Sequence, residues 1–105
     1  MTAMNMESYK NAIKEGKPFL AEFSAPWCSF CRKIGPALER VEKQYADRVL
    51  FGQIDVDDNP DVAHLEQVEV IPTLIFFKDG RAVGSVVAPD SKAKIESFIE
   101  ECLAK

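Results

Sequence analysis

Short apolar runs alternate with helix-like segments along nearly the whole sequence, and this alternation is the strongest constraint on the fold. Four runs are short and apolar enough to be buried strands. They cover residues 18–24, 49–56, 72–77 and 81–87. The predicted order is helix-strand-helix-strand-helix-strand-strand-helix. Strand-helix-strand units pair in parallel through right-handed crossovers, so we expect an α/β fold with a mixed sheet and helices on both faces.

Residues that start, stop or bend helices support this order. Asn5 is a typical N-cap for the first helix, and Gly16 is a typical end. Apolar residues recur at helical spacing from Ser29 to Tyr45. Pro36 lies inside that segment, where it removes a backbone donor and is expected to kink the helix.

Two further motifs predict a helix and a hairpin in the second half of the chain. Asn59 and Pro60 are suited to the N-cap and first position of a helix over 58–67. Asp79-Gly80 separates two strand-like runs and predicts a hairpin, which adds an antiparallel edge to the sheet.

Length and charge exclude several classes of protein. The chain has 105 residues, so we expect one domain over 1–105. Its 13 basic and 17 acidic residues give a net charge of −4, which argues against nucleic acid as a partner. No apolar run approaches the roughly 20 residues that span a bilayer, so we expect no membrane partner. The first ten residues lack a basic start and an apolar stretch, which predicts a cytoplasmic protein.

Cys28 and Cys31 are separated by two residues at a predicted strand-to-helix junction. Unpaired N–H groups and the helix dipole favour a thiolate at such a helix start, and a thiolate is the attacking species in disulfide exchange. The alternatives are a zinc site, for which only Cys102 and His64 remain as soft ligands, and an inert pair. The element order favours a redox dithiol.

Two weaker patterns have simpler interpretations. Residues 55–66 echo the acidic spacing of an EF-hand, but the sixth position is Pro60 where that loop needs glycine. Solvated acids and a helix cap are the preferred interpretation. Cys102 lies on the apolar stripe of the last helix and is expected to be a core residue; the alternative is a third redox thiol that forms intermolecular disulfides.

Several motifs in order along the chain resemble those of the thioredoxin family. They are "WCSFC" at 27–31, Pro36 five residues later, "DVDDNP" at 55–60, "VIPT" at 70–73 and "FFKDG" at 76–80. The resemblance covers nearly the whole chain. It implies a sheet of four or five strands, and because little chain precedes the first helix we expect four.

The resemblance also implies roles for individual residues. Cys28 is the expected nucleophile and Cys31 the resolving cysteine, with a Cys28–Cys31 disulfide in the oxidised form. Trp27 offers a flat surface to the incoming chain; the alternative is a tryptophan that fills the helix-strand junction. Pro72 matches the family's cis-proline, and Ile71 before it offers backbone groups to an extended substrate.

Glu22 lies in the first predicted strand, among apolar residues. If both faces of that strand are covered, burial raises the pKa of its carboxyl towards the range of a general base. The family usually has aspartate here, which helps deprotonate the second cysteine, and a lysine where this chain has Gln53. A neutral amide does not offset the charge, so we expect Glu22 to hold its proton more tightly. The alternative is a glutamate at a strand edge that reaches water.

The middle residues Ser29 and Phe30 differ from the family's common Gly-Pro pair. Phe30 restores a backbone N–H, and Ser29 adds a hydroxyl; both are expected to donate to Cys28 and make the dithiol somewhat less reducing. The Phe30 ring is expected at the rim of the site. Ala88 stands where the family usually has glycine, near the expected substrate groove, and its methyl group would narrow that groove.

The resulting prediction is a monomeric cytoplasmic protein disulfide reductase. It carries no nucleotide, flavin or metal motif, so we expect no bound cofactor. A separate flavoprotein or ferredoxin-linked reductase would recharge the dithiol. The alternatives are a more oxidising thiol oxidase or isomerase on the same fold, and a non-enzymatic binding module.

Overall fold

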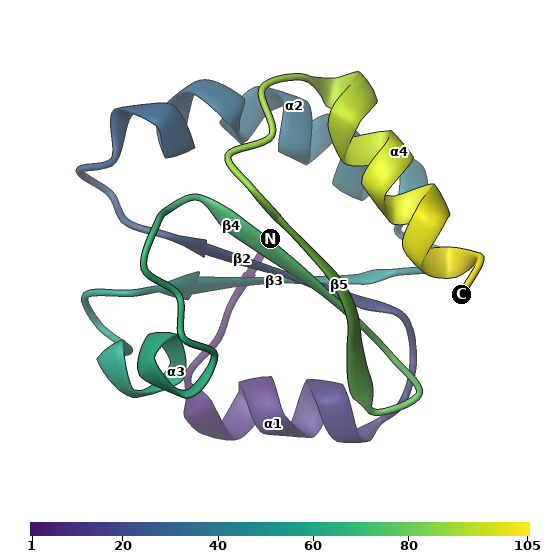
Figure 1. Cartoon of the computed structure of the whole chain (residues 1–105), viewed down its shortest axis with the longest axis horizontal. Helices are drawn as coiled ribbons and strands as arrows, with labels where there is room; N and C mark the ends of the chain where they lie inside the picture. The colour runs from purple at the N-terminus through teal and green to yellow at the C-terminus, as the bar shows by residue number, and fades with distance from the viewer.

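Five strands form one mixed sheet in the order β1-β3-β2-β4-β5, and four helices cover it (Figure 1). The computed structural model describes residues 1–105. The elements are β1 (Thr2–Ala3), α1 (Met6–Lys14), β2 (Phe19–Ser24), α2 (Ser29–Tyr45), β3 (Leu50–Asp55), α3 (Pro60–Leu65), β4 (Thr73–Lys78), β5 (Arg81–Val87) and α4 (Lys92–Leu103).

Strand pairing follows the predicted crossovers. β3 pairs in parallel with both β1 and β2, whereas β4 is antiparallel to β2 and β5. Asp79 and Gly80 have φ of 57° and 84°, the left-handed conformation that a two-residue hairpin turn of this kind requires. The α/β prediction with a mixed sheet and an antiparallel hairpin is confirmed.

The sheet separates two apolar clusters. On one face, α2 and α4 pack on alternate strand residues such as Leu20 and Leu74; on the other, α1 and α3 cover Phe19 and Phe23 (Figure 1). All six residues of β2 are buried, because this central strand has neighbours on both edges and helices on both faces. A polar side chain in β2 is therefore largely shielded from bulk water.

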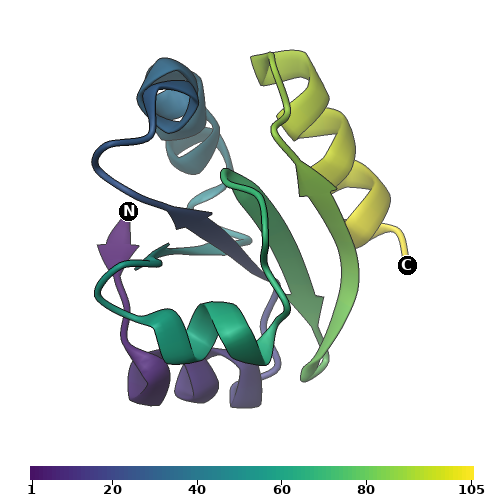
Figure 2. The same cartoon turned by 60° about the vertical axis from the view of Figure 1, so that its left-hand side comes forward.

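The fifth strand is β1, where we expected four strands with five as the alternative. It has only two residues, which pair with Gly52 and Gln53 of β3 at the sheet edge (Figure 2). Both residues of β1 are exposed, so no apolar alternation marks it in the sequence. Backbone hydrogen bonds, extended by Met4 N–H to Gln53 O at 2.9 Å, hold it in place.

Some helix ends have the caps that the sequence predicts, and others do not. Asn5 caps α1 through a capping box with Ser8, both bonds being 2.9 Å. Gly16 follows the helix with φ of 82°. The structure corrects the cap of α3: Asn59 precedes it, but its side chain donates to Asp55 O at 3.1 Å and caps nothing. α2 continues through Pro36 to Tyr45 as one helix.

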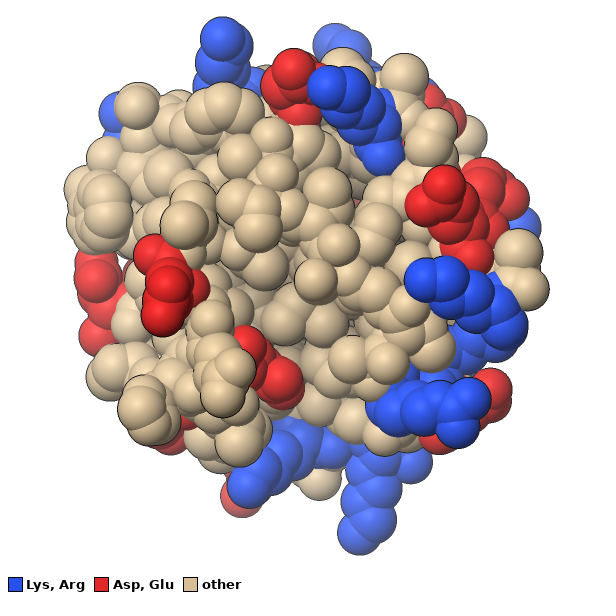
Figure 3. All heavy atoms as spheres, viewed as in Figure 1, with Lys and Arg blue, Asp and Glu red and all other residues tan.

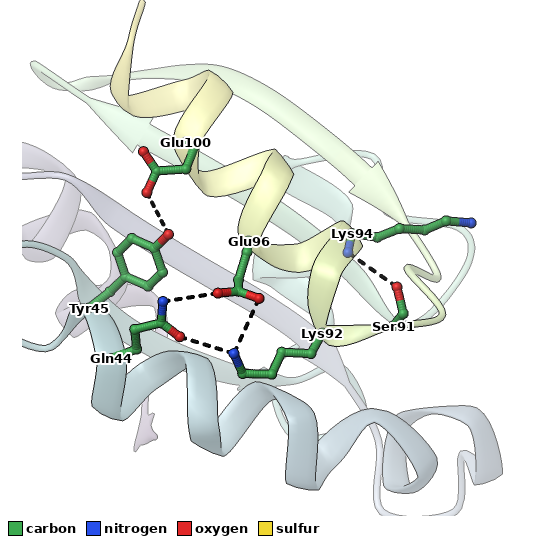
Figure 4. A network of polar contacts seen from close by, with 7 residues as sticks. All are labelled: Gln44, Tyr45, Ser91, Lys92, Lys94, Glu96 and Glu100. Carbon is green, nitrogen blue, oxygen red and sulfur yellow. Dashed lines mark hydrogen bonds and ion pairs between the residues drawn. The ribbon is translucent and has the colours of Figure 1, made fainter.

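Polar contacts join α2, the helix that begins at the dithiol, to α4 (Figure 4). Tyr45 donates its hydroxyl to Glu100 at 2.5 Å, and Gln44 donates to Glu96 at 2.9 Å. Burial and this bond raise the pKa of Tyr45 to about 12. Lys92 donates to Gln44 at 3.1 Å and pairs with Glu96 at 3.2 Å. α2, whose N-terminal end carries the dithiol, is thus anchored to α4.

Candidate active site

Cys28 ends the loop after β2 and is the N-cap residue of α2. Its Sγ accepts a hydrogen bond from the Cys31 N–H at 3.2 Å, so the sulfur itself occupies the acceptor position of a helix cap. A negative charge on this sulfur is favoured by that donor and by the positive end of the helix dipole. Cys28 is 7% exposed, so one edge of its side chain remains open to solvent.

Cys31 lies one turn deeper, at 7% exposure, with its side chain towards the sheet. Burial, followed by the hydrogen bond with Cys28, raises the pKa of the Cys31 thiol. Both cysteines are free, so the structure describes the reduced dithiol. The two sulfurs thus differ in environment: Cys28 Sγ lies at the helix start, whereas burial favours the protonated thiol of Cys31.

The donors predicted from the middle residues are absent. The Cys31 N–H alone donates to Cys28 Sγ; neither the Ser29 hydroxyl nor the Phe30 N–H makes such a bond. An N-cap side chain can accept from the second or the third N–H of the helix, and here Cys28 Sγ accepts from the third, that of Cys31. The expectation that Ser29 and Phe30 tune the dithiol by direct bonds to the sulfur is therefore wrong. Both side chains are exposed.

A loop before β4 faces the thiol. The Ile71–Pro72 peptide bond is cis, as the motif predicted, and Ile71 O lies 4.0 Å from Cys28 Sγ. Neither the N–H nor the C=O of Ile71 makes a backbone–backbone hydrogen bond. Thr73 donates its hydroxyl to Val70 O, and Ala88 N–H donates to Pro72 O at 2.8 Å. Beside the sulfur, the Ile71 N–H therefore has no backbone partner, and the Ile71 C=O has only the long contact from the Cys28 thiol.

Exposed apolar side chains surround Cys28 and the loop before β4. We call Trp27, Phe30, Val70 and Val87 the apolar rim; they are 65%, 36%, 55% and 54% exposed. The exposure of Trp27 excludes the alternative in which it fills a junction. Its indole Nε1 donates to Asp57 at 2.6 Å. Sequence reasoning missed Val70, Val87 and Asp57, because their proximity depends on how distant loops meet.

Ala88 continues the loop that carries Val87. It has φ of 48°, in the left-handed region where glycine is normally preferred. Its N–H bond to Pro72 O joins the end of β5 to the cis-proline loop. The methyl group is half-buried at the border of the apolar rim.

Glu22 is 2% exposed in the middle of β2, so the alternative of a water-exposed edge glutamate is wrong. Gln53 lies directly opposite it in the parallel register and donates its amide to Glu22 Oε1 at 3.0 Å. Burial raises the pKa of the Glu22 carboxyl, and the Gln53 hydrogen bond acts in the opposite direction. The predicted direction of the shift is confirmed.

A cavity of about 500 Å³ joins this carboxyl to the second cysteine. Glu22, Cys31, Gln53 and Pro36 all line it. Gln53 is an exposed residue, so the cavity reaches solvent on that side. A proton can therefore move between Cys31, Glu22 and solvent without crossing the apolar core.

The remaining candidates lie away from the site. Cys102 is 1% exposed in the core between the sheet and α4, in agreement with its expected packing role. His64 is exposed on α3, and no group of three ligating side chains that could hold a metal ion is present. Within the calcium-like pattern, Glu66 accepts the Tyr9 hydroxyl at 2.5 Å. None of the four helices is long and apolar enough to cross a bilayer.

A cysteine pair at a helix start, opposite a cis-proline loop and above a buried carboxyl, defines a thiol–disulfide oxidoreductase. The thioredoxin family profile matches residues 1–101. Thioredoxin 1 of Synechococcus elongatus is 34% identical over 102 residues, covering 96% of this chain and 95% of that protein. The thioredoxin of Acidithiobacillus ferridurans is 36% identical over 93 residues, covering 89% and 86%.

Solved structures give the same result. Mitochondrial thioredoxin 3 of Saccharomyces cerevisiae superimposes with a TM-score of 0.88 at 29% identity, covering 96% of this chain and 94% of that one. A Plasmodium falciparum thioredoxin has the same TM-score at 25% identity, covering 96% and 98%. The chain belongs to the thioredoxin family, and it is a protein disulfide oxidoreductase.

Proposed function

We propose that this chain works in the cytoplasm as a monomeric reductase of protein disulfides. The observation that carries the proposal is the position of the Cys28 sulfur. It accepts the Cys31 N–H at 3.2 Å as a helix cap and lies beside Ile71, whose backbone makes no backbone–backbone hydrogen bond. A nucleophile and a docking edge for the substrate thus lie together.

Substrate binding would use the loop before β4. An extended segment can pair with the free N–H and C=O of Ile71, in the manner of strand addition. Pro72 shapes the loop, and the rings of Trp27 and Phe30 cover the segment on the helix side. This pairing would bring a substrate sulfur in line with Cys28.

In the first chemical step, the Cys28 thiolate attacks one sulfur of the substrate disulfide. A Cys28–substrate bond forms, the substrate S–S bond breaks, and the other substrate sulfur leaves as a thiolate that takes a proton from water. The Cys31 N–H and the helix dipole stabilise the attacking anion.

In the second step, Cys31 must lose its proton, because burial keeps its thiol neutral. Glu22 accepts that proton across the shared cavity, for which a raised carboxyl pKa suits it. The Cys31 thiolate then attacks Cys28 Sγ. The Cys28–Cys31 disulfide forms, and the second substrate thiolate leaves; two electrons have passed to the substrate.

Reduction of Cys28–Cys31 would need two electrons and two protons from a separate thioredoxin reductase, either a flavoprotein or a ferredoxin-linked enzyme. The chain itself is proposed to hold no cofactor. The same exposed face would meet both the reductase and the substrates.

Insulin disulfide reduction with a small dithiol as electron source tests the proposal. We expect turnover that is lost in Cys28→Ser and retained in Cys102→Ala, which removes a thiol outside the site. No turnover would favour a non-enzymatic binding module. Turnover with a potential near the glutathione poise would favour an oxidase or isomerase.

A further inference from the structure

Charge is distributed unevenly around the dithiol. Residues 55–69 contain six of the chain's 17 acidic residues and no lysine or arginine. The rest of the chain has 13 basic residues against 11 acidic ones and is slightly positive. In Figure 3, the charged side chains on the α3 side of the uncharged surface are acidic, whereas Lys and Arg side chains are mixed with acidic ones along the top and right edges.

Four acids of this segment are exposed, and we call Asp57, Asp58, Asp61 and Glu69 the acidic rim. Asp57 contacts the apolar rim directly, since it accepts the Trp27 indole N–H at 2.6 Å. Glu69 comes two residues before Ile71, and consecutive Cα atoms are about 3.8 Å apart. It therefore lies within a few ångströms of the docking backbone.

No acid of the acidic rim has a cationic partner within the chain. The ion pairs of the structure join other residues, which lie at the N-terminus, on α2 and α4, and in the segments that follow α2 and precede α4. A group of carboxylates without counter-charges beside an apolar surface gives a local negative potential that attracts a cationic partner.

We propose that the preferred substrates are extended disulfide-bearing segments with Lys or Arg within a few residues of the attacked cysteine, on the side that lies over α3. This inference rests on the proposed reductase function and names its substrate class. The apolar rim and Ile71 dock the segment at Cys28. The acidic rim selects basic segments and repels acidic ones.

Exposed charge pairs contribute a few tenths to about 1 kcal/mol each. Two or three such contacts give a preference of about three- to tenfold in kcat/KM for a basic over an acidic segment. Ions screen these contacts because the Debye length falls from about 30 Å at 0.01 M salt to about 3 Å at 1 M. The preference is therefore expected at low salt and not at high salt.

The test uses three synthetic peptides with one interchain disulfide each, identical except that the flanking residues are Lys, Ser or Glu. At low salt we expect kcat/KM in the order Lys, Ser, Glu, and near-equal values at about 1 M salt. The triple variant Asp58→Asn, Asp61→Asn, Glu69→Gln should reduce the Lys-to-Glu ratio about threefold, while the Ser peptide keeps its rate. Asp57 stays intact because it holds Trp27.

A matched control removes three exposed acids elsewhere: Glu15→Gln, Asp47→Asn, Glu101→Gln. Its net charge changes equally, so an unchanged Lys-to-Glu ratio supports the local acidic rim, and an equal fall overturns it. Equal rates for the three peptides at low salt would overturn the inference and leave the reductase function in place. Reduction of none of them would overturn the reductase function, and the inference with it.

Discussion

Gln53 donates its side-chain amide to Glu22 Oε1 at 3.0 Å, from the position directly opposite in the parallel β2–β3 register. A neutral donor thus contacts the buried carboxyl from the solvent side of the cavity that Glu22 shares with Cys31. Burial raises the pKa of the Glu22 carboxyl, and the Gln53 amide and then the charged N-terminus of the chain oppose that rise. The first three predictions concern this pair.

Glu22→Gln should slow the resolving step by about tenfold, which is less than the roughly 10²–10⁴-fold usual for a general base, because solvent reaches the cavity and can take the proton instead. In the native chain the rate of mixed-disulfide release should rise with pH through the raised pKa of Glu22. The release rate of the Glu22→Gln variant should lack this rise with pH. Single-turnover release measured as a function of pH checks this; identical profiles would remove Glu22 from the mechanism.

Glu22→Gln should also make the folded chain more stable at neutral pH. Because the folded pKa is above the unfolded one, the folded chain holds a proton that the unfolded chain releases, so native stability falls as pH rises between the two values. Each tenfold difference in proton affinity is worth about 1.4 kcal/mol. Urea unfolding should show no gain in the variant below about pH 4, where the carboxyl is protonated in both states. The gain should grow at higher pH. Glu101→Gln, at an exposed site, should show no such trend.

Gln53→Lys should lower the pKa of Glu22, because a cation beside the carboxyl favours its ionised form. Gln53→Met, of similar size but without a donor, should raise it further. NMR titration of the Glu22 side-chain carboxyl checks both directions. A pKa that is the same in all three proteins would contradict the role given to this contact.

Gly84→Ala should destabilise the fold without touching the site. A Cβ at Gly84 would lie 2.8 Å from Cys102 Sγ and 3.3 Å from Phe98 Cε1. Overpacking of this kind costs about 1–3 kcal/mol. In a Cys102→Ala background the sulfur is absent and the cost should fall; urea unfolding of the four proteins gives the coupling. Additive effects would contradict the contact.

The sequence predicts an element when the residues of that element themselves cause its structure. β2 is a run of buried residues, and Asp79-Gly80 has the residues that a left-handed two-residue turn needs. β1 escapes prediction because only backbone bonds hold it, so its exposed side chains carry no signal.

The site likewise has features that the sequence predicts and features that only the folded chain reveals. The positions of Cys28, Cys31 and Pro72 follow from motifs, and the burial of Glu22 follows from its apolar neighbours. The Trp27–Asp57 bond joins residues 30 positions apart, so only the folded loops bring them together. The donors expected from Ser29 and Phe30 failed because the sulfur accepts from the Cys31 N–H, a choice between cap donors that the motif alone does not reveal.

Trapping the mixed disulfide is the most direct test of the account, because it reveals which sulfur attacks. Cys31→Ser, incubated with a disulfide-containing protein and then digested, should yield a covalent adduct that mass spectrometry locates at Cys28. Cys28→Ser should yield none. An adduct at Cys102, or one formed equally by both variants, would contradict the assignment of Cys28 as nucleophile and Cys31 as resolving cysteine.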